Sequence, residues 1–154
     1  RDGEARDLLP SARDGEARVA PKTAILPAER AFLDGWTALR QGRHQVAAAY
    51  FTRAAEQSGG ATSVSLQEDA RYWRAVALAR AGQHAPAVVA LRDFLRQHPR
   101  SARAGEATVI LGWQLLRAGQ LDEAQRCFAA AASDAHSAIR DNARSGLAAV
   151  AARR

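Results

Sequence analysis

Apolar residues recur with a helical period along most of the chain. From Glu29 onward they return at intervals of three and four residues, which is the spacing of one face of an α-helix. The pattern predicts helices at about 29–41, 45–57, 65–81, 102–118, 121–132 and 137–152, and a further helix that has Pro86 in its first turn and ends at His98–Pro99. Ser65 and Glu68 match a capping box at the start of the third helix. The segment 58–65 before it is expected to be a loop.

Three glycines, Gly42, Gly82 and Gly119, follow helices at intervals of 40 and 37 residues. Aligning the chain on them brings residues of similar size into register: Gly35, Ala75 and Gly112; Ala47, Ala87 and Ala124; Phe51, Leu91 and Phe128; Ala54, Phe94 and Ala131. A fixed period of this length is typical of a solenoid of helix pairs. The small residues are expected where two helices approach closely, and the large ones between pairs.

The segments "FLDGWTALRQGRHQVAAAYFTRA" (32–54) and "VILGWQLLRAGQLDEAQRCFAAA" (109–131) resemble tetratricopeptide repeats. The resemblance covers residues 29–152. It implies an all-α fold, a right-handed α-solenoid of antiparallel helix pairs with three repeats and a C-terminal closing helix. Two departures are His44 and His84, which stand where the family usually has tyrosine. The first two units are also longer than the family's 34-residue motif.

Residues 94–128 are also similar to repeats of bacterial cell-envelope coordinators and outer-membrane assembly lipoproteins. The matching positions are His98, Pro99, Ser101, Ala104, Gly112, Gly119, Ala124 and Phe128. This resemblance implies a periplasmic or envelope-associated protein of a Gram-negative bacterium, and a cytoplasmic adaptor is the alternative.

Residues 1–28 differ from the repeat region. The hexapeptide "RDGEAR" occurs twice, at 1–6 and 13–18, and Pro10, Pro21 and Pro27 prevent a long helix. We expect a linker or extended arm here and the helical domain at 29–152. Because the chain begins at Arg1 and lacks methionine, we expect a processed product or a fragment, with any signal peptide upstream.

Composition narrows the function classes. Alanine is about a quarter of the 154 residues, which favours closely packed helices. The net charge of +6 permits contact with nucleic acid but is also ordinary for a soluble domain. No apolar run approaches the roughly 18 residues of a membrane span.

We find no motif for catalysis, for a metal or for a cofactor. The four histidines and the single cysteine are too scattered for a metal site. The segment "HSAIRDNARSG" lacks a nucleophile elbow, and "QSGGAT" lacks the lysine of a phosphate loop. Cys127 is expected to be a buried thiol, and His44 and His84 are expected to pack at the helix-pair junctions. We therefore predict a non-enzymatic protein.

The family resemblance implies that the first helix of each pair lines a concave groove. The facing positions are then Glu29, Asp69 and Glu106; Phe32, Tyr72 and Val109; Trp36, Val76 and Trp113; Leu39, Ala79 and Leu116; Arg40, Arg80 and Arg117. We therefore predict a groove with an acidic edge, an aromatic and apolar floor, and an arginine edge. Its predicted binding residues are Phe32, Trp36, Arg40, Tyr72, Arg80, Trp113 and Arg117.

Arginine binds carboxylates through two parallel hydrogen bonds, and exposed aromatic residues often anchor interfaces. The groove therefore suits a peptide with apolar side chains and an acidic group. Acids in a first turn and arginines in a last turn also complement the helix dipole, which explains these charges without any ligand.

Three functions follow from these observations. The first is a protein–protein interaction scaffold that binds a peptide or protein segment in its groove. The second is nucleic-acid binding by a basic solenoid, which the groove acids disfavour. The third is self-association into a homo-oligomer through Leu147, Val150 and Ala151 of the last helix. The chain's own N-terminal arm, with Asp7–Leu8–Leu9 and Ile25–Leu26, is a further candidate occupant of the groove.

Overall fold

The computed structural model describes residues 24–59 and 64–154. The predicted arm, including Asp7–Leu8–Leu9, therefore lies almost wholly outside the described residues. Within those residues all regular structure is helical. The seven helices are α1 (Pro27–Arg40), α2 (His44–Gln57), α3 (Val64–Arg80), α4 (His84–Gln97), α5 (Ala104–Arg117), α6 (Leu121–Ala131) and α7 (Ser137–Ala152).

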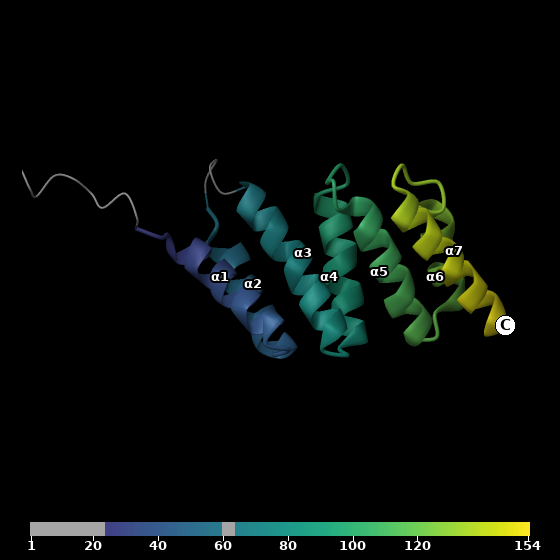
Figure 1. Cartoon of the computed structure of the whole chain (residues 1–154), viewed down its shortest axis with the longest axis horizontal. Helices are drawn as coiled ribbons and strands as arrows, with labels where there is room; N and C mark the ends of the chain where they lie inside the picture. The colour runs from purple at the N-terminus through teal and green to yellow at the C-terminus, as the bar shows by residue number, and fades with distance from the viewer. Residues whose placement is uncertain (1–23, 60–63) are drawn as a thin grey trace, which may run out of the picture.

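The helices stack in chain order into an elongated array (Figure 1). Each helix packs against the next one in the sequence, and α1, α3, α5 and α7 also contact one another in succession. The first helices of the pairs therefore form one continuous face, and α7 covers the C-terminal end. This arrangement confirms the all-α solenoid of helix pairs with a closing helix.

The three repeat-marking glycines end α1, α3 and α5 in the same way. Gly42, Gly82 and Gly119 have φ values of 73°, 75° and 79°, a left-handed conformation that side chains with a Cβ avoid. In the last of these turns, the Gly119 N–H donates to the Leu116 carbonyl at 3.1 Å and the Gln120 N–H donates to the Leu115 carbonyl at 2.9 Å. The same pair of bonds closes the other two turns, which are Schellman motifs.

Small residues allow the two helices of a repeat to approach closely. A Cβ at Gly35 would lie 2.8 Å from the ring of Phe51, and one at Gly112 would lie 2.7 Å from the ring of Phe128. Both phenylalanines are fully buried. The middle repeat has the smaller Leu91 and can therefore accommodate Ala75 in place of glycine. The structure confirms the predicted register of small and large positions.

Two helix starts and one surface differ from the expectations. Helix α1 begins at Pro27, two residues before the predicted boundary. Helix α3 begins at Val64, so Ser65 lies inside its first turn and is not the predicted N-cap. Val150 is only 2% exposed and Leu147 is partly buried, because both pack against the core. These two large side chains therefore do not form the apolar C-terminal surface that we expected for self-association.

No helix in residues 24–59 and 64–154 is long and apolar enough to cross a membrane.

Candidate ligand-binding groove

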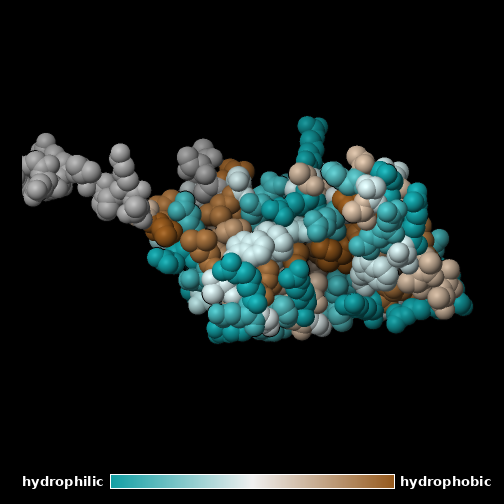
Figure 2. All heavy atoms as spheres, in the orientation of Figure 1, coloured by the Kyte–Doolittle hydropathy of each residue, from teal (hydrophilic) through white to brown (hydrophobic). Residues whose placement is uncertain are grey.

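A hollow of about 510 Å³ opens between α3 and α5. Its walls are Tyr72, Trp73, Val76, Ala79 and Arg80 from α3, and Glu106, Ile110, Trp113, Gln114 and Arg117 from α5. Figure 2 shows a recess between these two helices, with hydrophobic atoms at its base and hydrophilic atoms around it. Glu106 and Ile110 also border a second hollow of about 450 Å³, which reaches Ile139 and Asn142 of α7. The two hollows therefore form one groove across α3, α5 and α7.

The groove is open between α3 and α5 because aliphatic side chains stand there at two positions that carry tryptophan between α1 and α3. We call the space between two successive first helices a valley. In the first valley, between α1 and α3, Trp36 of α1 packs against Trp73 of α3 with ring centroids 4.4 Å apart. Relative to the turn glycines, the equivalent residues between α3 and α5 are Val76 and Ile110. Two aliphatic side chains fill less space than two indoles. The space taken up by aromatic rings in the first valley is consequently accessible in the second.

Two polar contacts fix the α5 wall of the hollow. The indole N–H of Trp113 donates a hydrogen bond to Asn142 Oδ1 of α7 at 2.8 Å. The side chain of Gln114 is buried, and its Oε1 lies 2.6 Å from Nδ1 of His84 at the start of α4. This contact agrees with the expectation that His84 packs at a helix-pair junction. Both contacts orient groove residues before any ligand binds.

Arg80 and Arg117 form one end of the hollow. They are the last residues of α3 and α5, and both are exposed. Neither side chain forms a hydrogen bond or an ion pair with another residue of the described chain. Each therefore presents an uncompensated guanidinium, whose planar fork can bind a carboxylate bidentately.

One of the two acidic residues predicted near the opposite end, Asp69, is paired with an arginine of the chain. Asp69 Oδ1 accepts a hydrogen bond from Arg103 Nε at 3.2 Å, and the Arg103 guanidinium lies over the rings of Tyr72 and Trp73. Burial and the neighbouring carboxylate of Glu106 raise the pKa of the Tyr72 phenol above its ordinary value. The charged residues that line the hollow are Glu106 and the two arginines. The hollow therefore has a net positive charge.

Residues 69–101 match the family model of the tetratricopeptide repeat. This segment contains most of α3, all of α4 and the loop after it, so it supplies one wall of the hollow. Residues 69–101 form a tetratricopeptide repeat. No curated protein matches the chain. Tetratricopeptide repeats are typically non-enzymatic scaffolds for protein–protein interaction.

The tetratricopeptide repeat and the following helix bring together four of the seven predicted binding residues, namely Tyr72, Arg80, Trp113 and Arg117. The other three, Phe32, Trp36 and Arg40, belong to α1 and do not line this hollow. Phe32 and Trp36 pack partly buried against the core, and Arg40 is exposed at the end of α1.

Tyr72 differs from the expected exposed aromatic residue, because it is only 1% exposed. The partly buried aromatic residue on this side of α3 is Trp73, which the sequence analysis missed. Positions 72 and 73 both continue the helical stripe through Asp69 and Val76, so the spacing alone cannot assign either one to the groove. One sequence signal could have found Trp73. Alignment on the turn glycines places it at the position of Ile110, which also lines the hollow.

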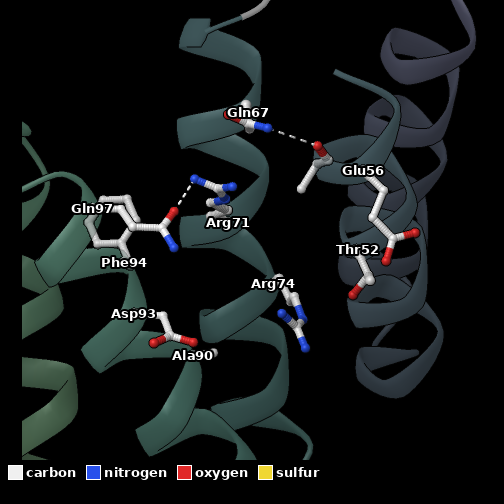
Figure 3. A pocket seen from close by; sticks show the side chains of 10 residues that line it. Thr52, Glu56, Gln67, Arg71, Arg74, Ala90, Asp93, Phe94 and Gln97 are labelled. Carbon is white, nitrogen blue, oxygen red and sulfur yellow. Dashed lines mark hydrogen bonds between the residues drawn. The ribbon is translucent and has the colours of Figure 1, made fainter. Parts of the chain in front are cut away.

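The tetratricopeptide repeat has another hollow on the opposite side of α3. It measures about 320 Å³ and lies among α2, α3 and α4 (Figure 3). Arg71 donates a hydrogen bond to Gln97 there, and Gln67 bonds the Ala55 carbonyl at 3.2 Å. Arg74 faces the same space as the carboxylates of Glu56 and Asp93. The charges balance and the hollow is smaller, so it has no clear preference for one class of ligand.

Proposed function

We propose that the chain is a protein–protein interaction module that binds an extended segment of a partner protein in the hollow between α3 and α5. The observation that carries this proposal is the pair of exposed arginines, Arg80 and Arg117, at one end of a hollow that is otherwise largely apolar. Neither arginine is paired with another of the residues that the structure describes. The tetratricopeptide repeat that forms one wall supports a protein as the partner.

The size of the hollow suits a short peptide. Its volume of about 510 Å³ lies within the usual range of ligand sites. Glu106 and Arg117 stand at its two ends on α5, and eleven residues of helix span roughly 16 Å at about 1.5 Å per residue. An extended segment covers that length with about five residues, since each adds roughly 3.3 Å.

The charges select a ligand with an acidic group. A carboxylate at the arginine end would bond two guanidiniums, whereas a basic side chain there would be repelled. At the other end Asp69 is already paired with Arg103, so Glu106 is the main acceptor left for a backbone N–H or a basic group. The proposed partner segment therefore has apolar side chains in its middle and an acid near one end.

A peptide selection tests this function. The full chain is used to select binders from a random peptide library, and their affinities are then measured on the wild type and on Arg80→Ala/Arg117→Ala. We expect the double variant to lose about tenfold or more in affinity, since hydrogen bonds between charged groups are the strong ones.

Arg40→Ala is the matched control. It removes the same helix-end charge from α1, so it reproduces any effect on the helix dipole without changing the hollow. We expect it to bind selected peptides like the wild type. Equal affinity of all three proteins, with all of them folded, contradicts the proposal. Salt-dependent binding of generic RNA or DNA that outcompetes the peptides favours the nucleic-acid alternative.

We also propose that the protein acts in the bacterial cell envelope. This location rests on the resemblance of residues 94–128 to envelope repeats. Fractionation of cells that express the native gene, followed by immunodetection, tests the location. Recovery with the cytoplasmic marker alone overturns it.

A further inference from the structure

We propose that the hollow between α3 and α5 takes an aromatic side chain of the partner, and that an acidic residue two positions from it in the partner binds Arg80 and Arg117. This inference rests on the proposed function and specifies the chemistry of the bound segment. It follows from a comparison of successive valleys on the same face of the solenoid.

The first valley shows how an aromatic side chain fits between two first helices. Trp36 enters the space between α1 and α3, where its ring packs edge-on to Phe51 at 6.4 Å and against Trp73 at 4.4 Å. At the equivalent positions the second valley has Val76 and Ile110, and an open hollow results. An aromatic side chain of the partner can therefore take the place that Trp36 occupies within the chain.

The walls of the hollow favour an aromatic group over an aliphatic one. Trp73 borders it on one side and Trp113 on the other. Trp113 is held in place by Asn142, and Trp73 is held between Trp36 and the guanidinium of Arg103. Two fixed indoles offer an inserted ring edge-to-face contacts, which an aliphatic chain cannot reproduce.

The arginines set the position of the acid. Arg80 follows Val76 by four residues on α3, and Arg117 follows Trp113 by four on α5. Four residues of helix correspond to about 6 Å, so the carboxylate binds about that far from the ring. In an extended segment this distance spans two residues, at about 3.3 Å each, and side chains two residues apart point to the same face. The predicted motif is thus an aromatic residue with Asp or Glu two positions away.

Three blocked pentapeptides test the inference on the full chain. The probes are Gly-Trp-Gly-Asp-Gly-amide with an uncharged fluorophore on its N-terminal amine, called the Trp-Asp peptide, and its variants with Leu in place of Trp or Asn in place of Asp, each measured by fluorescence anisotropy. We expect the Trp-Asp peptide to bind about tenfold more tightly than either of the other two. Loss of the acid removes a charge-assisted bond, and loss of the ring removes the aromatic contacts.

Val76→Trp places in the second valley the residue that the first and third repeats carry at this position. We expect it to fill the hollow and abolish binding of the Trp-Asp peptide. Ile110→Trp fills the same space from α5. It replaces Val76→Trp as the test variant if Val76→Trp does not fold. The thermal midpoint is measured for each, and only a folded variant is compared.

The outcomes separate the inference from the function on which it rests. Equal affinity for the Leu-Asp and Trp-Asp peptides overturns the aromatic preference and leaves the proposed function standing. Unchanged affinity of a folded Val76→Trp or Ile110→Trp protein overturns the location. Absence of binding by all three peptides overturns the inference, while the library selection decides the proposed function independently.

Discussion

Single side chains set the spacing of the helices within each repeat. Phe128 lies against both Gly112 of α5 and Gly146 of α7, where added Cβ atoms would stand 2.7 Å and 2.4 Å from its ring. In the middle repeat Ala75 and Leu91 occupy the positions of Gly112 and Phe128. Glycine with phenylalanine and alanine with leucine are thus two solutions to the same packing requirement.

This equivalence predicts a coupled pair of substitutions. Gly112→Ala adds a methyl group against Phe128, and we expect a loss of about 1–3 kcal/mol in the free energy of unfolding from overpacking. A gain of up to about 1 kcal/mol in helix propensity opposes this loss. Gly112→Ala/Phe128→Leu recreates the pair of the middle repeat and should be less destabilised than the sum of the single variants. Denaturant unfolding of all four proteins measures the coupling, and simple additivity would refute this packing account.

Tyr72 predicts a dependence of stability on alkaline pH. Its pKa is raised by burial and by Glu106, so the unfolded chain loses the phenolic proton first as the pH rises. The free energy of unfolding should therefore decrease above pH 10, the ordinary pKa of tyrosine, by up to about 1.4 kcal/mol per pH unit for one proton. Tyr72→Phe should lack this component. Urea unfolding of both proteins from pH 8 upward measures the difference, and parallel pH curves would exclude this role.

The sequence predicted the packing of residues better than their exposure. Gly35, Gly112 and the two phenylalanines were assigned correctly because size complementarity repeats with the period of the fold. Tyr72 and Trp73 are neighbours on the edge of one helical stripe, so periodicity could not decide which of them faces the core. Packing against a neighbouring repeat makes that decision.

At the scale of helices, the ends could be predicted from local residues. Glycine and proline terminate helices whatever the tertiary packing, and the predicted ends of α1, α3 and α5 lie within one residue of the observed ones. The start of α3 was predicted wrongly because a serine and a glutamate three residues apart can also stand inside a first turn. There the capping-box pattern misled the prediction by about one position.

The turn after α3 predicts the cost of removing one of these glycines. Gly82 has a φ of 75°, and alanine in the left-handed region is less favourable by about 1–2 kcal/mol. We expect Gly82→Ala to reduce the free energy of unfolding by roughly that amount. Gly59→Ala is the control, because Gly59 does not have a left-handed φ and a Cβ there meets no atom within 4 Å among the residues that the structure describes. Equal unfolding curves for the two variants would show that the left-handed φ at Gly82 does not require glycine for stability.

At the scale of the whole molecule, the groove depends on residues from successive repeats. The arginine edge could be read from the sequence because Arg80 and Arg117 repeat in register. The hollow between α3 and α5 was not predicted. It results from two aliphatic residues, Val76 and Ile110, at positions where the first valley has tryptophan. The pairing of Asp69 with Arg103 also crosses from α3 to the loop before α5, and it neutralises one of the acids that the sequence analysis placed on the acidic edge of the groove.

Isoleucine methyl groups give the most direct test of the central claim that a partner segment binds between α3 and α5. The chain has only three isoleucines: Ile110 in that hollow, Ile139 in the adjoining one and Ile25 at the N-terminal end. Methyl spectra of isoleucine-labelled protein are recorded during titration with a peptide selected from the library. The largest shift is expected at Ile110, a smaller one at Ile139 and none at Ile25. A saturable titration that shifts Ile25 and leaves Ile110 unchanged would contradict the account.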